Sequence, residues 1–261
     1  MNDKYRIDGN TLIFNAEVTS ITADDLYDDY IDLNDELKNI TSIIIPDSVT
    51  KIGQHAFRFC KSLESITIPD SVTEIGESAF EYCTNLKSVV IPDSVTEIGY
   101  QAFAFCKKLE SVIISEGVKQ ISDSAFERCV SLENVIIPDN VIKIDNHLFM
   151  GCTSLTSIII PDSVTEIGIG AFFDCRNLMN ITLPDSVTEI GNSAFFDCRN
   201  LMNITLSDNV TEIGENAFAN CPNLTIQCTK GSYAEKYAKK RNIPCETTKS
   251  DKSKNDYGYD T

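Results

Sequence analysis

The sequence predicts a repeat solenoid, which is a stack of small coils with a parallel β-sheet along one face. Two observations lead to this fold class. Eight cysteines follow one another at intervals of 23 residues, without insertion or deletion: Cys60, Cys83, Cys106, Cys129, Cys152, Cys175, Cys198 and Cys221. The residues around each cysteine repeat as well, so most of the chain is a tandem array of one short unit. A fixed period of this length is typical of stacked coils rather than of a closed globular domain.

The first half of each unit predicts a strand that ends in a turn, as residues 63–71 illustrate. Ile66 and Ile68 are separated by a single residue, and this period of two is typical of a strand with one buried face. Pro69 has no N–H to donate and therefore ends the hydrogen-bonded ladder. Asp70 favours a turn directly after it. The strands of successive units should pair in parallel to form the main sheet.

The second half of each unit predicts a short extended piece, a bend and a single helical turn. Val72 and Ile75 supply apolar side chains for a second row of short strands, and Gly76 permits the bend that follows. The next apolar residues, Ala79, Phe80 and Cys83, lie three or four residues apart, as on one side of a helical turn. No unit can cover its own apolar residues, so we expect stacking to bury them, with the phenylalanines in a central column.

The repeated pattern LxxIxIPxxVxxIGxxAFxxCxxL resembles the BspA-type leucine-rich repeat, over residues 40–228. The resemblance implies a right-handed leucine-rich-repeat solenoid that binds proteins and has no enzymatic activity. BspA-like proteins are often surface or secreted adhesins of bacteria and protists, which implies an adhesin-like role. The chain departs from the pattern where Ser115 and Ser207 replace Pro, Ser122 and Asp145 replace Gly, and Leu148 replaces Ala. Most of these changes fall in residues 109–154, where we expect local bending.

We expect four parts along the chain. Residues 1–39 form an N-terminal cap with a hairpin near Gly9, which closes the first edge of the sheet. Residues 40–228 form the solenoid, with eight units and a final strand. Residues 229–246 form a C-terminal capping helix, with Ser232 as N-cap and Glu235 three residues later. Residues 247–261 are polar and predict a disordered tail.

The charge of the chain limits its partners. The net charge is −17, and an acidic body repels phosphate backbones, so we expect no nucleic-acid partner. No apolar run reaches the length of a membrane span, so we expect no membrane insertion. The first residues lack a secretory signal, which predicts a cytoplasmic protein if Met1 is the true start. The family resemblance implies the cell surface or secretion instead. We expect a monomer and a protein partner of unknown identity.

The cysteine ladder predicts small buried thiols that fill the corner of each coil. Disulfides between coils and a metal site are the alternatives, but the spacing is unlike that of converging zinc ligands, so we expect no metal and no cofactor. Cys228 and Cys245 lie outside the ladder. They would pair across the C-terminal cap in an oxidising compartment and would otherwise remain thiols.

A column of acidic residues follows the strands, and it has two interpretations. An aspartate after proline suits a turn, through a hydrogen bond from the backbone to its side chain. A row of close carboxylates would also bind calcium or polyamines. The alternative function is therefore a structural or cation-dependent self-assembly module, with end-to-end stacking. The column consists of Asp47, Asp70, Asp93, Glu116, Asp139, Asp162, Asp185 and Asp208.

The candidate binding site is the outward face of the main sheet. We expect no catalytic residues, because neither a nucleophile elbow nor a phosphate loop is present in the sequence. Between the two buried positions of each strand lies the sheet-face column: Ile44, Thr67, Val90, Ile113, Ile136, Ile159, Thr182 and Thr205. Aliphatic residues in line on an exposed face make a larger patch than strand propensity requires. A secondary aromatic patch consists of Phe59, Tyr82 and Phe105, in the corners of the first coils.

Overall fold

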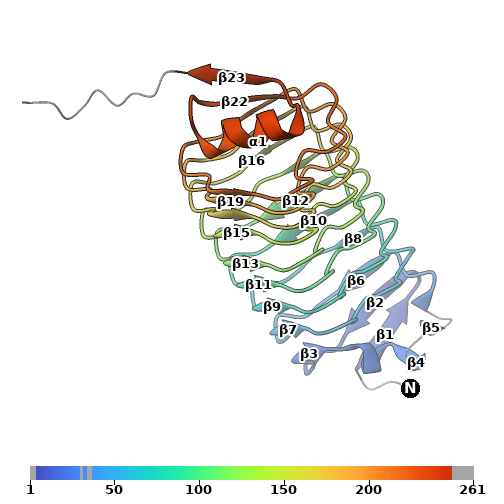
Figure 1. The fold of residues 1–261 in the computed structure, drawn as a ribbon. Coiled ribbons are helices and arrows are strands. Elements are labelled where there is room, and N and C mark those ends of the chain that lie inside the picture. Colours follow the sequence, from blue (N-terminus) through green and yellow to red (C-terminus); the bar gives the residue numbers. More distant parts are fainter. Residues whose placement is uncertain (1–3, 30–31, 34–36, 249–261) are drawn as a thin grey trace, which may run out of the picture.

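A computed structural model describes residues 4–29, 32–33 and 37–248 of the 261-residue chain. The chain forms an elongated stack of coils that advances by one 23-residue unit at a time (Figure 1). The predicted solenoid fold with parallel sheets is confirmed. Each coil contributes one strand to the main sheet and one two-residue strand to a second sheet.

The main sheet is built from two consecutive ladders. The first runs in the order β1 (Tyr5–Asp8), β2 (Thr11–Phe14), β6 (Ser42–Ile44), β8 (Ser65–Ile66), β10 (Ser88–Ile91), β12 (Ser111–Ile114) and β14 (Asn134–Val135). The second runs in the order β16 (Ser157–Ile159), β18 (Asn180–Thr182), β20 (Asn203–Thr205), β22 (Thr225–Thr229) and β23 (Cys245–Thr248). All neighbours pair in parallel except β1 and β2, which form an antiparallel hairpin.

The second sheet is also built from two ladders. The first contains β3 (Ser20–Ile21), β7 (Lys51–Ile52), β9 (Glu74–Ile75), β11 (Glu97–Ile98) and β13 (Gln120–Ile121). The second contains β15 (Lys143–Ile144), β17 (Glu166–Ile167), β19 (Glu189–Ile190) and β21 (Glu212–Ile213). Equivalent residues of successive coils face one another in register, as Glu74 and Glu97 do. The buried isoleucines of these strands therefore form a continuous row inside the stack.

The core between the two sheets is a column of stacked phenylalanine rings. Ring centroids of successive coils lie between 5.0 and 5.8 Å apart. The rings are completely buried from the first coil to the seventh, and the last ring is nearly so. Because each ring contacts only its neighbours above and below, the energy of the fold is distributed along the stack. The column consists of Phe57, Phe80, Phe103, Phe126, Phe149, Phe172, Phe195 and Phe218.

The corner of each coil is not the predicted helical turn, and this expectation was wrong. Two residues in each of the first seven corners adopt the left-handed backbone conformation, as Ser78 and Tyr82 do with φ values of 51° and 61°, and one residue, Asn220, does so in the last. A right-handed helix does not continue through such residues. Backbone N–H groups of alternate corner residues donate to the next coil instead, as between Phe80 and Ala102 at 2.7 Å. Residues three or four apart lie on the same side of this corner, as they do in a helix. The spacing of the apolar residues therefore could not distinguish this corner from a helical turn.

Both sheets are interrupted where bending is expected. The second sheet stops at β13 and restarts at β15, and the main sheet stops at β14 and restarts at β16. At most coils the bend holds a glycine whose Cβ would clash with the preceding coil; at Gly99 it would lie 2.7 Å from the Gly76 carbonyl carbon. Ser122 and Asp145 occupy this position in two consecutive coils. The ladder of the second sheet breaks between these two coils, whereas Ser122 still donates its N–H to the Ile98 carbonyl of the preceding coil at 2.9 Å.

Side-chain hydrogen bonds bridge part of this gap. The Asn146 backbone N–H donates to the Asp123 carboxylate at 3.1 Å, and the Asn146 side chain accepts from the Ile169 N–H at 2.8 Å. Asp145 itself is largely buried, 3.5 Å from the Lys143 ammonium. Burial raises the pKa of the Asp145 carboxyl, and the nearby Lys143 offsets this only in part.

This raised pKa gives a testable pH dependence. The folded protein holds the Asp145 proton more tightly than the unfolded chain, so the carboxyl stabilises the fold at low pH. That contribution is lost as the pH rises through the folded-state pKa, above the ordinary value of 3.8. We therefore expect Asp145→Asn to raise the melting temperature at pH 7 and to leave it unchanged below the ordinary carboxyl pKa. Thermal unfolding followed by circular dichroism across this pH range measures the difference.

The matched control for this experiment is Asp162→Asn, because Asp162 is exposed in the neighbouring coil. It should change the melting temperature little at any pH. A lower melting temperature of Asp145→Asn at pH 7 would show that the ion pair with Lys143 outweighs the cost of burial.

Both ends of the stack are capped. At the N-terminal end, the β1–β2 hairpin turns at Gly9, which has a φ of 58°, and the 3-10 helix η1 (Ala23–Asp25) follows β3. Strands β4 (Tyr27–Asp29) and β5 (Asp32–Leu33) form a small antiparallel pair in the later part of this cap. Residues 30–31 and 34–36 of that region lie outside the described residues.

At the C-terminal end, α1 (Tyr233–Arg241) covers the last coil (Figure 1). The Ser232 hydroxyl accepts from the Glu235 N–H at 3.2 Å, and Glu235 accepts from the Gly231 N–H at 2.7 Å. Strand β23 then pairs with β22 and includes Thr247 and Thr248, where disorder was expected. The open edge of β22 accounts for this, because it provides the hydrogen-bonding partners. The rest of the predicted tail lies outside the described residues. In the part of the chain that is described, no helix is long and apolar enough to cross a membrane.

Candidate protein-binding face

The sheet-face column projects outward from the main sheet, opposite the phenylalanine core. Its aliphatic members alternate with buried neighbours along each strand, as in the pattern of exposed Ser88, buried Val89, exposed Val90 and buried Ile91. The exposed fraction rises along the stack: Ile44 51%, Val90 54%, Ile113 59%, Ile136 70% and Ile159 80%. We call these five residues the aliphatic stripe. Thr67, Thr182 and Thr205 continue the column and are exposed as well.

Parallel pairing keeps the stripe in line. Val90 pairs with Ile113 in the first ladder, and Ile159 pairs with Thr182 in the second. The interruption of the main sheet falls inside the stripe, where only an isolated bridge joins Ile136 to Ile159. The two most exposed aliphatic residues therefore lie at the position where the sheet is least constrained. Ile13 of the N-terminal cap pairs with Ile44 and extends the column, although the repeat pattern does not reach it.

Carboxylates border the stripe. The acidic column lies in the turns that follow the strands, and its members are exposed. Glu64, Glu110 and Glu133 are exposed on the other border, where Lys87 forms an ion pair with Glu64 at 2.8 Å. The stripe therefore lies between the acidic column and a row of exposed serine and asparagine residues, such as Ser88 and Asn134, beyond which the glutamates lie.

A groove connects the stripe with the acidic column. It has a volume of about 590 Å³, and its lining includes Thr67 and Val90 of the column together with Asp70 and Asp93. The hydroxyl of Ser94 in this lining is buried and makes no hydrogen bond within the described residues. An apolar wall and two carboxylates are thus available to the same ligand.

The turn of the fourth coil shapes one side of this groove. Ser115 replaces the usual proline and donates its N–H to the Ile91 carbonyl at 3.2 Å, a bond that proline cannot make. Gly117 replaces the usual serine, and a Cβ there would lie 1.8 Å from the Asp93 carbonyl oxygen. This turn therefore packs directly against the preceding one, and the departure from the repeat has a structural reason.

In the other turns, serine or asparagine side chains donate to the preceding coil, and within the acidic column the Glu116 carboxylate accepts from the Asp139 N–H at 3.2 Å. Ser71 and Ser186 donate to the Val49 and Val164 carbonyls of the preceding coils, at 2.7 and 2.6 Å. Asn209 donates to the Asp185 carbonyl at 2.8 Å. The aspartate side chains were predicted to accept hydrogen bonds from the backbone of these turns. The structure shows instead that the residue after the aspartate hydrogen-bonds the turn to the preceding coil. In the described part of the chain, no three potential ligands converge on a metal position.

The aromatic patch is a stack of half-buried rings. Phe59 and Tyr82 lie 5.1 Å apart and Tyr82 and Phe105 lie 4.5 Å apart, between ring centroids. All three residues have φ values near +60°, a conformation that is uncommon for bulky side chains. The Arg58 guanidinium lies 4.7 Å from the Phe59 ring centroid, and that of Arg128 lies 6.0 Å from that of Phe105.

The structure also shows apolar surface that the sequence analysis missed. Phe173 and Phe196 stack with ring centroids 4.8 Å apart, one residue before the left-handed corner position. Ile142 and Ile169 are 64% and 49% exposed. For Ile142 and Ile169 the signal was present, because these are apolar residues at repeat positions that are polar in most other units.

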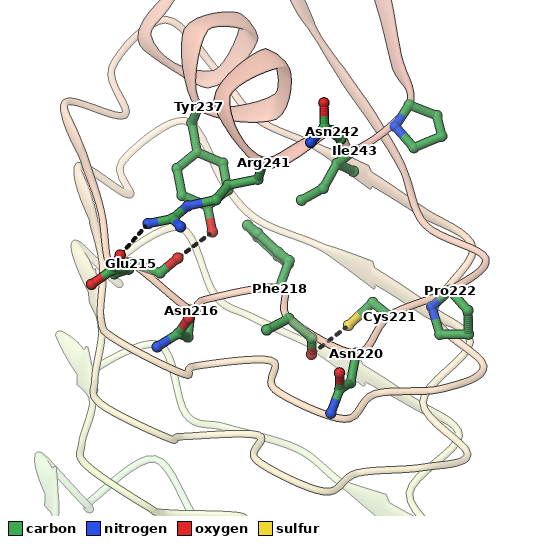
Figure 2. A pocket seen from close by; sticks show the side chains of 12 residues that line it. Glu215, Asn216, Phe218, Asn220, Cys221, Pro222, Tyr237, Arg241, Asn242 and Ile243 are labelled. Atoms are coloured by element: carbon green, nitrogen blue, oxygen red, sulfur yellow. Dashed lines mark hydrogen bonds and ion pairs between the residues drawn. The ribbon is translucent and has the colours of Figure 1, made fainter.

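A separate cavity of about 380 Å³ lies under the C-terminal helix. Figure 2 shows Tyr237 and Arg241 of α1 extending toward Glu215 of the last coil. The Tyr237 hydroxyl donates to the Glu215 carbonyl at 3.4 Å, and Arg241 forms an ion pair with the Glu215 carboxylate at 3.0 Å. These contacts hold α1 on the stack, so the cavity belongs to the packing of the cap.

The cysteine ladder is buried from Cys60 to Cys198, and Cys221 at its end is half-buried. The Cys129 thiol donates to the Phe103 carbonyl of the preceding coil at 3.1 Å, and this bond recurs from Cys83 to Cys221. Burial raises the pKa of Cys129 to about 12. A thiol that is not ionised is a poor nucleophile, so the ladder serves packing.

Comparison with known proteins agrees with the repeat pattern. The family model for the BspA-type leucine-rich repeat region matches in six copies, over residues 35–156 and 142–237. A leucine-rich repeat protein from Bacteroides ovatus is 29% identical, with a TM-score of 0.67, and the match covers 86% of this chain and 69% of that one. A leucine-rich repeat protein from T. pallidum is 25% identical, with a TM-score of 0.59, covering 95% and 97%. Comparison with curated protein sequences gives no significant match.

The matched region extends across the whole solenoid and both similar structures share its fold. Repeats of this type are generally protein-binding or surface modules rather than enzymes. The resemblance noted in the repeat pattern is therefore confirmed, and the chain belongs to the BspA-type leucine-rich repeat family.

Proposed function

We propose that this chain is a non-enzymatic, adhesin-like binding module and that its partner is a basic protein segment lying along the sheet-face column. The observation that carries the proposal is the aliphatic stripe, whose five side chains are each more than half exposed and aligned. Burying such a row against a partner removes apolar surface from water, at about 25 cal/mol for each Å².

Charge complementarity selects the kind of partner. The acidic column lies on one side of the stripe, glutamates lie beyond the serine row on the other side, and the chain has a net charge of −17. A partner with aliphatic side chains between lysines or arginines would bury the stripe and would form ion pairs with the carboxylates on either side of it. The Asp70 and Asp93 carboxylates in the groove beside Val90 provide positions for such cations.

The test is a selection of binders from a random peptide library displayed on phage. We expect the selected peptides to combine aliphatic residues with lysine or arginine, and their affinity to fall with added salt. The double variant Ile113→Asp, Ile136→Asp should weaken binding at least tenfold, which corresponds to about 1.4 kcal/mol. Fluorescence anisotropy with a selected, labelled peptide measures the dissociation constant.

The matched control is Ile142→Asp. Ile142 lies in the same coil as Ile136 and is 64% exposed, but it is outside the sheet-face column. It should leave the affinity unchanged, and circular dichroism should show that all variants are folded. Equal losses from the stripe and control variants, or selected peptides without basic residues, would contradict the proposal.

For the aromatic patch we propose a secondary contact with the same partner. Bulky residues are uncommon in the left-handed conformation, so the backbone conformation does not favour aromatic residues at Phe59, Tyr82 and Phe105. Asparagine tolerates this conformation, so Tyr82→Asn isolates the ring. A several-fold loss of peptide affinity supports a contact, whereas a lower melting temperature with unchanged affinity would assign the stack to stability alone.

A further inference from the structure

The C-terminal end of the solenoid brings together the two cysteines that lie outside the ladder. Cys228 is in β22 and Cys245 is in β23, the outermost strand of the second main-sheet ladder (Figure 1). The strands pair with Ile226 opposite Cys245 and with Cys228 opposite Thr247. Residues two apart project from the same face of a strand, so both thiols lie on the inward face. Their Sγ atoms are 3.1 Å apart.

This pair differs from the ladder thiols in its contacts. A ladder thiol such as Cys129 is fully buried and bonds to a backbone carbonyl of the preceding coil. Cys228 and Cys245 bond to each other instead, with Cys228 buried and Cys245 half-buried. A reagent can therefore approach Cys245, and Cys228 is in place to attack the same sulfur.

We propose that Cys228 and Cys245 form a disulfide when the protein meets a disulfide oxidant such as oxidised glutathione, and that this bond fastens β23 to the end of the solenoid. The Cys245 thiolate attacks one sulfur of the oxidant, whose S–S bond breaks and releases one glutathione. The Cys228 thiolate then attacks Cys245, forms the protein disulfide and expels the second glutathione. Two electrons pass to the oxidant, and the two protein protons end on the two glutathione thiols.

The bond would act on the least protected part of the cap. Strand β23 pairs only with β22 among the described strands, and Glu246, Thr247 and Thr248 are exposed. The crosslink joins positions 17 residues apart and encloses α1. Closing this loop restricts the opened state of the cap, so β23 and α1 should open less often when the bond is present.

In the experiment, the full chain is incubated with mixtures of reduced and oxidised glutathione. It is then unfolded, its free thiols are alkylated, and the products are identified by mass spectrometry. Burial and the neighbouring Cys228 thiol raise the pKa of Cys245 to about 12, so a mildly alkaline buffer and long incubation are needed. Of the ten cysteines, we expect eight to be alkylated after oxidation, with one linked peptide containing Cys228 and Cys245. Hydrogen exchange of the β23 amides should slow about a hundredfold, the factor expected for a closed loop of this length.

Two variants control the experiment. Cys245→Ser should leave all nine remaining thiols alkylated and should remove the slow exchange of β23. Cys221→Ser removes another half-buried thiol and should still give the linked peptide. Ten alkylated thiols in the oxidised chain, a stable glutathione adduct on Cys245, or a link within the ladder would overturn the assignment. A correct link without slower exchange would overturn the fastening of β23.

Discussion

Phe126→Ala is expected to cost about 3–5 kcal/mol of unfolding free energy, the range measured for aromatic residues removed from cores. Phe126 is completely buried in the middle of the phenylalanine column, 5.5 Å from Phe103 and 5.8 Å from Phe149 between ring centroids. The cavity cannot be filled from the sides, because each neighbour is fixed in its own coil. Urea denaturation followed by circular dichroism measures the loss.

The same variant should also change how the protein unfolds. A stack whose coils contact only their neighbours can separate at its weakest interface. Phe126 lies in the coil after which the second sheet is interrupted, one coil before the interruption of the main sheet, so its loss should split the transition into two steps. Phe196→Ala is the matched control, since Phe196 is half-buried and stacks at 4.8 Å on the outside of the corner. We expect it to cost about 1 kcal/mol and to keep a single transition. A single transition for both variants would contradict the coil-by-coil distribution of stability.

The second large effect is expected from Gly117→Ser, although serine is the usual residue at this repeat position. A Cβ at Gly117 would lie 1.8 Å from the Asp93 carbonyl oxygen, and a backbone atom cannot move aside alone. The turn must shift, at a cost of about 1–3 kcal/mol, and the groove beside Val90 should change with it. Thermal unfolding and the peptide affinity defined above report these two consequences.

The controls distinguish the effect of losing Gly117 from the effect of placing a serine at this repeat position. Asn140→Ser and Asn209→Ser introduce the same serine at equivalent positions of other coils and should change stability little. Ser115→Pro combined with Gly117→Ser restores the usual turn sequence and should recover most of the loss. If Gly117→Ser were neutral, the close packing of this turn against Asp93 would be wrong.

The repeat alone predicted most of the fold. Its period identified the stacked coils, and the apolar positions within it identified the buried column from Phe57 to Phe218. The exposed positions of the aliphatic stripe also follow from alternation along each strand, because a strand with one buried face must expose the other. The bend expected in residues 109–154 coincides with the interruption of both sheets.

The errors have a common cause. A spacing of three or four residues describes the corner correctly as a compact turn, but it does not report the sign of φ, so the left-handed residues were missed. The acidic column was assigned the hydrogen bonds of the turns because aspartate can make them, whereas neighbouring serines such as Ser71 donate to the preceding coil. Strand β23 was not predicted because its extended conformation depends on pairing with β22, which residues 245–248 alone do not reveal.

The sequence by itself determined the architecture, because every coil repeats the same pattern of apolar and turn residues. Coils with the same pattern bury one another's apolar side chains when they stack. It also determined which residues lie inside and which lie outside. Only the tertiary structure decided how departures from the repeat act: the contact of Gly117 with Asp93, the gap between Ser122 and Asp145, and the meeting of Cys228 with Cys245. These depend on distances between coils, and such distances are set by the packing of the whole stack rather than by any one segment.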